Sequence, residues 1–417
     1  MRWIVGFLVC ILLTAYFHQG KKINGVIWSD QEGYYIYLPA IFINGGFENL
    51  YCFNGCTEVE TENGERIFTK YTYGVALLES PFFLVAHTLA PMFGFERNGR
   101  TLPYIWAVMI AAIFYMLLGL FLLGKLLRKL RFEDTVSWLV PLGLLLGTNL
   151  FYYTFREAGM SHVYSFFLIS LLIYSSHHKW VTKKLVWDVI SAITLVIIIL
   201  IRPTNAMAIF IPLLWGVDPK NVLSRVKSFA TDFRWILIFV VATLIIFLPQ
   251  LLYWKTTTGS YVFYSYGSEG FRYWNSPKML QVLFSPQNGW LVYSPLAIVG
   301  LFGIGWMIRH KKTGWLLPTV LLTLATYVFG SWWAWWFGGA FGHRCYVDYL
   351  PLLAVPSAVT VSKIMIASRA IKRLTTTVFF IAVFVNIRMS DIYHGMWDGP
   401  DWGWLNYLEK LANAFYL

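Results

Sequence analysis

Hydrophobic residues occur in long runs along almost the whole chain, and polar residues gather in the segments between them. Runs of about 17 to 25 apolar residues are long enough to cross the hydrocarbon core of a bilayer. The sequence predicts about eleven such helices, a short one near 204–217 and longer ones near 3–18, 102–123, 135–154, 160–176, 185–201, 235–254, 290–308, 315–331, 347–367 and 374–390. We therefore predict an all-α integral membrane protein whose chain termini lie on opposite sides of the membrane.

Residues 74–93 are apolar enough to span but contain Glu79, Pro81 and His87. A carboxylate near the bilayer centre costs about 2.5 to 3.5 kcal/mol, so we interpret this segment as an interfacial or re-entrant helix. This choice places the N-terminus with Arg2 and all basic loops on the cytoplasmic side, as the positive-inside rule requires. These loops are 125–131, 177–184, 220–234, 309–312 and 363–373.

Composition agrees with this class, because 58% of the residues are hydrophobic and 13% are charged, against roughly 25% charged in soluble domains. A net charge of +12 would suggest nucleic acid as the partner of a soluble protein. Here the basic residues lie between hydrophobic runs, so they indicate topology, and no nucleic-acid partner is expected.

The long polar segments are predicted to lie on the outer side. They are a first outer loop at 19–101 with interfacial helices, a second loop at 256–289 and a short tail at 391–417. Residues 1–390 then form one polytopic membrane domain with no separate soluble domain. The first loop carries Cys52 and Cys56, which could form a disulfide, and the acidic residues Asp30, Glu32, Glu48, Glu58, Glu60, Glu62 and Glu65.

An acidic pair, Asp30 and Glu32, stands where the chain first emerges on the outer side. The spacing from Ser29 to Glu32 fits a capping box, which would explain Glu32 structurally. Asp30 would then lie in the first helical turn, where the helix dipole lowers the pKa of a carboxyl group. A carboxylate kept charged can accept a proton or bind a cation; the alternative is that Asp30 only stabilises the helix.

Further polar residues recur at the outer ends of the predicted helices, where cations could bind phosphate. Each also has a structural explanation: Lys70 could reach the lipid headgroups, Arg202 could cap a helix, and Glu157 could pair with Arg156. Their shared sidedness favours one common site. The set is Lys70, Arg156, Glu157, His162, Arg202, His343 and Arg344.

A tryptophan-rich segment at 331–344 ends in Gly342, His343 and Arg344. Tryptophans at an outer boundary typically form an aromatic belt. The glycines would also permit close backbone approach, and His343 and Arg344 could donate hydrogen bonds to an oxyanion.

The order of these motifs resembles the GT-C superfamily of integral-membrane glycosyltransferases. The likeness is to the bacterial branch with the lipid A aminoarabinose transferase and protein O-mannosyltransferases, and it extends to about residue 360. It implies a polyprenyl-phosphate sugar donor and a lipid, glycan or protein acceptor at the outer face of a bacterial cytoplasmic (inner) membrane. The chain departs from the family pattern at Gln31, where a second acid is common, and at Tyr71 and Thr72, which replace a Pro-Pro pair.

The resemblance implies roles for the candidate residues. Asp30 matches the catalytic base and Glu157 a second acidic position, while Lys70, Arg202, His343 and Arg344 would bind the donor phosphate. We also assign to substrate binding Glu32, Tyr34, Tyr71, His162 and Tyr346. Some members of the superfamily use a divalent metal, for which Asp30 and Glu157 are the obvious ligands; we favour metal independence and assign no metal site. The large soluble C-terminal domain of several members is missing, which leaves acceptor recognition to the outer loops.

Two other functions fit the same residues. A flippase or transporter of a lipid-linked sugar would place charges along a pathway within the spans, whereas here the charges cluster on one face. A ligase or polymerase that transfers a glycan from a polyprenyl diphosphate would use the same cations.

Overall fold

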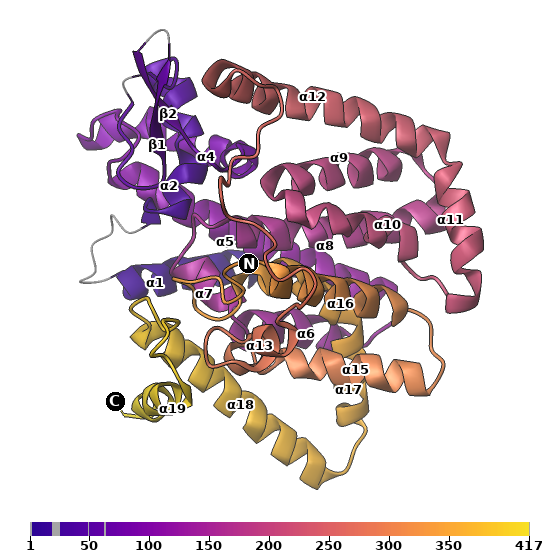
Figure 1. Ribbon diagram of the computed structural model, residues 1–417. Coiled ribbons are helices and arrows are strands. Elements are labelled where there is room, and N and C mark those ends of the chain that lie inside the picture. Colours follow the sequence, from indigo (N-terminus) through magenta and orange to yellow (C-terminus); the bar gives the residue numbers. More distant parts are fainter. Residues whose placement is uncertain (1, 19–25, 49, 62–63, 417) are drawn as a thin grey trace.

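A computed structural model of the protein describes residues 2–18, 26–48, 50–61 and 64–416. The fold is helical, as predicted, and aligned axes are seen for the long helices α5 (Leu102–Lys129), α8 (Ser161–Thr182), α9 (Leu185–Ile201) and α12 (Phe233–Thr258) (Figure 1). Within the described residues the one sheet is the antiparallel hairpin of β1 (Thr57–Thr61) and β2 (Gly64–Phe68), which was not predicted.

In the described part of the chain, five helical segments are individually long and apolar enough to span a membrane, and a sixth candidate is a pair, 203–214 and 219–230, bent by 98°. The five are Gly74–Phe93, Leu102–Lys129, Phe233–Thr258, Arg344–Met365 and Arg369–Ile392. Shorter apolar helices are Gly6–His18, Asp134–Leu146, Leu185–Ile201, Ala297–Arg309 and Leu316–Ser331. The protein is thus an integral membrane protein, while the total of about eleven spans stays a prediction.

Several predicted continuous helices are broken. The run at 135–154 divides into α6 (Asp134–Leu146) and α7 (Leu150–Phe155), and the run at 290–308 into α14 (Trp290–Tyr293) and α15 (Ala297–Arg309). A proline at 295 lacks the N–H that would continue the helix. At the first break the Thr148 hydroxyl donates to the Leu144 carbonyl, 2.6 Å away, and takes over one freed backbone acceptor.

Residues 74–93 form α4 (Gly74–Leu89) and the 3-10 turn η3 (Ala90–Phe93). Glu79 is 2% exposed, and Tyr164 of α8 donates a hydrogen bond of 2.6 Å to its carboxyl group. The protein interior therefore provides a partner for this group, and its presence does not exclude a span. The interfacial placement of α4 stays a prediction.

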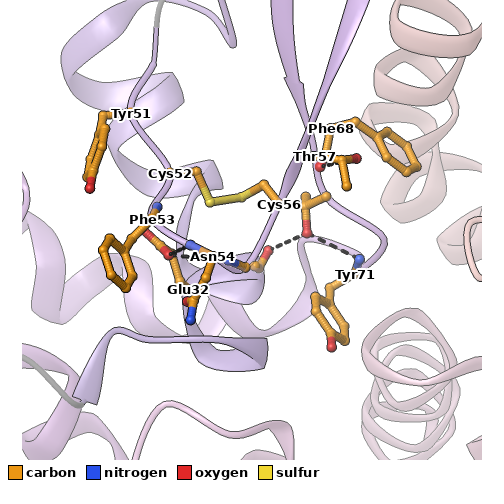
Figure 2. The surroundings of a disulfide bond; sticks show 12 residues. Glu32, Tyr51, Cys52, Phe53, Asn54, Cys56, Thr57, Phe68 and Tyr71 are labelled. Carbon is orange, nitrogen blue, oxygen red and sulfur yellow. Dashed lines mark hydrogen bonds between the residues drawn. A yellow bond between two sulfur atoms is a disulfide. The ribbon is translucent and has the colours of Figure 1, made fainter.

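The segment predicted as the first outer loop lies at one end of the long helices. It follows α1 (Arg2–His18) and contains α2 (Asp30–Tyr35), α3 (Tyr37–Pro39), the π-helical turn η2 (Ala40–Asn44) and the β1–β2 hairpin (Figure 1). The beginning of this predicted loop, 19–25, and Glu62 lie outside the described residues. The predicted disulfide between Cys52 and Cys56 is confirmed (Figure 2).

Two of the basic loops predicted to be cytoplasmic meet in one ion-pair cluster, in which Lys179 and Asp188 are buried. Lys179 at the end of α8 bonds Asp188 of α9 over 2.8 Å and also pairs with Asp232, just before α12, while Arg234 pairs with Asp188. The helix ends that carry the loops 177–184 and 220–234 therefore lie together, on the same side of the protein.

Helices α15, α16, α17 and α18 complete the fold on the opposite side of α5 and α8 from α12 (Figure 1). The tail after α18 (Arg369–Ile392) turns back, and the Asp398 carboxylate accepts a hydrogen bond of 2.7 Å from the Gly339 amide. The remaining elements are η4 (Pro203–Ile209), α10 (Phe210–Leu214), η5 (Pro219–Asn221), α11 (Val222–Ala230), α13 (Met279–Phe284), α16 (Leu316–Ser331), η6 (Arg344–Leu353), α17 (Ala354–Met365) and α19 (Trp404–Asn413).

Candidate active site

A cavity of about 510 Å³ brings together segments that lie far apart in the sequence. Its walls come from α2, the segment between β2 and α4, the start of α8, the end of α9, the 256–289 loop and the tryptophan-rich segment before η6. Seven predicted site residues line it: Asp30, Tyr34, Lys70, Tyr71, His162, Arg202 and Arg344. The predicted residues Glu32, Glu157, His343 and Tyr346 lie outside its lining.

Asp30 begins α2, and its carboxylate is partly exposed to the cavity. Its Oδ2 lies 3.1 Å from Nη1 of Arg344, and the Tyr71 hydroxyl donates a hydrogen bond to it. Burial alone would raise the pKa of Asp30, but Arg344, the Tyr71 hydroxyl and the charge of Lys70 together hold this pKa below its usual value. The direction is the one predicted, although the cause is Arg344 and its neighbours rather than the helix dipole.

The predicted capping box is wrong. Ser29 makes no side-chain cap bond and has φ of 53°, and its amide instead donates to Oδ1 of Asn54, 2.7 Å away. The buried Glu32 carboxylate accepts backbone hydrogen bonds from Phe53, Asn54 and Gly55 at 2.9, 3.0 and 3.3 Å (Figure 2). It also lies 2.7 Å from Nη2 of Arg100. Glu32 therefore holds the disulfide loop, and its proposed contact with substrate is not supported.

Lys70 follows β2 and points into the cavity rather than to lipid headgroups. Its Nζ lies 3.1 Å from Oε1 of Glu269 and 5.6 and 5.2 Å from the ring centres of Tyr71 and Tyr266. Glu269 belongs to the 256–289 loop and lines the same cavity. Sequence reasoning missed Glu269, because nothing near it in the chain indicates that it faces Lys70.

Arg202 stands at the end of α9, with Nη1 3.2 Å from Nδ1 and 3.3 Å from Nε2 of His162 and with Nη2 3.1 Å from Sγ of Cys345. His162 Nδ1 lies 2.8 Å from Oδ1 of Asp348. With the Nδ1 proton donated to the carboxylate, Nε2 keeps the ring's acceptor lone pair beside the guanidinium.

The network continues behind His162 into the core. Asn205 donates to Oδ2 of Asp348 over 2.8 Å and accepts from the Tyr349 hydroxyl, also over 2.8 Å. All four of these side chains are buried, so a change in one member is felt by the others. Asp348 and Asn205 were not predicted, because nothing near either one in the chain indicates that the two side chains meet.

Glu157 lies in the turn between α7 and α8 and accepts a hydrogen bond of 2.9 Å from the Tyr152 hydroxyl. Burial raises the pKa of Glu157 to about 7, although Arg344 and the Tyr152 hydroxyl act in the opposite direction. Arg156 donates to the Phe17 carbonyl over 3.0 Å. Glu157 thus lies behind Arg344 and influences the cavity through that residue's charge.

His343 and Tyr346 support the tryptophan-rich segment from inside the protein, and both are buried. His343 Nε2 lies 3.1 Å from the Trp335 carbonyl oxygen, and Tyr346 donates to the Thr326 hydroxyl over 2.7 Å. The roles predicted for them in phosphate and substrate binding are therefore not supported by their positions.

The tryptophan-rich segment supplies an aromatic wall to the cavity, formed by Trp332, Trp333, Trp336 and Phe337. Two of its glycines, Gly338 and Gly342, are required by close packing. A Cβ on Gly338 would lie 2.6 Å from Oδ2 of Asp398, and one on Gly342 the same distance from Tyr293. Among the residues that the structure describes, no three His, Cys, Asp or Glu side chains are grouped closely enough to hold a metal ion.

No protein-family model matches the sequence, and no curated protein matches it. The structure is similar to that of ArnT from Cupriavidus metallidurans bound to undecaprenyl phosphate, with a TM-score of 0.57 and 14% sequence identity. The similarity covers 93% of this chain and 65% of the ArnT chain. An aspartate and three cations on one cavity thus occur within an ArnT-like fold.

Proposed function

We propose that the protein is a GT-C glycosyltransferase that moves a sugar from a polyprenyl-phosphate donor to an acceptor at the outer face of a bacterial cytoplasmic membrane. The observation that carries this proposal is the convergence of Asp30 with Lys70, Arg202 and Arg344 on one cavity. The ArnT-like fold supports it, since that structure holds undecaprenyl phosphate.

The charges of the cavity suit this reaction. Asp30 takes a proton from the acceptor hydroxyl or amine while the acceptor atom bonds to the anomeric carbon. The bond from that carbon to the phosphate oxygen breaks on the opposite face, so the sugar inverts and polyprenyl phosphate leaves with the electron pair. Lys70, Arg202 and Arg344 stabilise the negative charge that grows on the phosphate.

The cations differ in how readily they meet a phosphate. Lys70 is paired with Glu269, and Arg344 with Asp30, whereas the atoms closest to the Arg202 guanidinium belong to His162 and Cys345. Arg202 is therefore the first anchor for the phosphate. Lys70 and Arg344 then exchange part of their contact with carboxylates for contact with the donor.

The test is transfer of labelled sugar from a panel of short-chain polyprenyl-phosphate sugars by purified protein in detergent. We expect Asp30→Asn to lower the rate about 10²- to 10⁴-fold, the usual contribution of a general base. Asp401→Asn, a change of the same type at an exposed position in the tail, should retain the wild-type rate.

Each other result has a distinct meaning. An Asp30→Asn variant with the normal rate would remove Asp30 from the mechanism. Transfer only from a diphosphate-linked glycan would indicate a ligase or polymerase, and lipid movement in vesicles with no transfer would indicate a flippase.

A further inference from the structure

The loop closed by the Cys52–Cys56 disulfide presents its backbone to Glu32. The amides of all three enclosed residues, Phe53, Asn54 and Gly55, donate to the Glu32 carboxylate, which is fully buried (Figure 2). Unpaired backbone N–H groups and an unpaired buried carboxylate each destabilise the fold. Because the loop amides and the Glu32 carboxylate bond to each other, these bonds fix the loop on α2.

The same loop also holds the residue before Asp30. Oδ1 of Asn54 accepts a hydrogen bond of 2.7 Å from the Ser29 amide, and Ser29 adopts a positive φ of 53°. A residue other than glycine costs energy in this conformation and keeps it only when its surroundings impose it. The bond to Asn54 is such a constraint.

Gly55 makes the closest approach of the loop to α2. A Cβ at this position would lie 2.4 Å from the Ser29 carbonyl oxygen and 2.5 Å from the Gly33 nitrogen. The loop therefore contacts α2 on both sides of Asp30, at Ser29 and at Glu32–Gly33. The carboxylate between them faces Arg344 and Tyr71 instead.

We propose that the disulfide-closed loop 52–56 is a clamp that sets the position of Asp30 against Arg344, with Glu32 and Asn54 as positioning residues. This inference rests on the proposed function, in which Asp30 is the base. As a consequence of this clamp, turnover depends on the oxidised disulfide, although the disulfide contacts neither the substrate nor the reacting atoms.

Reduction tests the clamp in the folded protein. A water-soluble phosphine delivers two electrons to the disulfide, which takes up two protons to give two thiols, and the phosphine becomes its oxide with oxygen from water. We expect kcat to fall about 10- to 100-fold, the scale of a misplacement near 1 Å. The KM for donor should change less, because Arg202 and Arg344 lie on other elements. Cys52→Ser with Cys56→Ser should match the reduced protein and be insensitive to the phosphine.

Two single substitutions separate the parts of the clamp. Glu32→Gln places an amide NH₂ against backbone donors, and Asn54→Ala removes the bond to Ser29; both should lower kcat. Glu58→Gln, at an exposed position on β1, is the matched control and should behave like wild type. Thermal unfolding in detergent shows whether each variant is folded.

The pH profile distinguishes positioning from a general loss of structure. If Asp30 moves away from Arg344, its pKa rises, so the acidic limb of the kcat profile should shift to higher pH in the reduced protein and in Glu32→Gln. Asp30-dependent transfer with an unchanged rate and profile, in protein shown by thiol titration to be reduced, would overturn the clamp.

Amide hydrogen exchange tests the clamp independently of turnover. Reduction should speed exchange of the amides in residues 29–35 at least 10-fold and leave α8 unchanged. Failure of wild-type protein to transfer from any donor would contradict the proposed function, and unchanged exchange at 29–35 would contradict the clamp.

Discussion

Arg344 Nη1 lies 3.1 Å from Asp30 Oδ2, so the first outer loop and the start of η6 meet at one ion pair on the cavity wall. Both side chains are partly buried, at 18% and 29% exposed, and both charges are therefore less screened than at the surface. In the proposed reaction Arg344 serves two groups, since it keeps the base ionised and faces the departing phosphate.

Replacing Arg344 with Gln should lower kcat about 10²- to 10³-fold, the usual cost of losing one electrostatic donor. It should also raise the pKa of Asp30, which moves the acidic limb of the pH–rate profile upward. The control is Arg97→Gln at an exposed position on the same outer segment. An unshifted acidic limb would mean that Arg344 does not tune Asp30.

Replacing Glu269 with Gln should lower the KM for donor about 1.4- to 5-fold, because the phosphate no longer competes with a carboxylate for Lys70. This range corresponds to the 0.2–1 kcal/mol of a partly exposed ion pair. In a Lys70→Met background the same change should have no such effect. A weaker donor affinity in Glu269→Gln would indicate that Glu269 binds substrate itself.

Glu157 should make the folded protein less stable as pH rises. Its folded pKa is raised to about 7, whereas an unfolded glutamate titrates near 4.3. Between these values the native state binds more protons than the unfolded state, so the free energy of unfolding falls as pH increases. Thermal unfolding in detergent at a series of pH values should show this decline in wild type and a flatter curve in Glu157→Gln. Equal slopes would contradict the assignment.

Asp348→Asn should weaken donor binding more than it slows chemistry. The carboxylate fixes the His162 tautomer, and the neutral amide can present its NH₂ to Nδ1 instead. Nε2 then carries the proton, so it can no longer accept a hydrogen bond from the Arg202 guanidinium. We expect KM for donor to rise about 10-fold, close to the roughly 1.5 kcal/mol of a hydrogen bond to a charged group. Tyr349→Phe, one step further along the network, should have a smaller effect.

The sequence predicted that Asp30, Lys70, Arg202 and Arg344 share one site, and all four line one cavity. They stand at the ends of apolar runs, and a membrane confines such residues to one layer, where they can meet. Pairings within that layer were beyond reach: Glu32 fits a local capping rule, but it is used by a loop that a disulfide folds back onto it. Glu269 and Asp348 could not be assigned, because their partners are set by tertiary packing between distant segments.

The broken helices show the same limit. The hydropathy of a run indicates whether the run is long enough to cross the apolar layer. It does not show where a helix within that layer breaks or changes direction. The breaks at 147–149 and at Ser294 meet each other, since the Ser294 hydroxyl bridges the amide and the side chain of Asn149 at 3.0 and 2.9 Å. Each break supplies hydrogen-bond partners to polar groups of the other. The sequence of one helix alone cannot reveal this pairing.

The bond between Asp398 and Gly339 ties the tail to the tryptophan-rich wall of the cavity. Gly339 directly follows the last lining residue of this wall, Gly338, so the carboxylate supports from behind a surface that substrate would touch in the proposed reaction. A deletion that begins before residue 398 is consequently not a neutral change in this protein. A loss of activity after such a deletion would report a displaced wall rather than a missing catalytic group.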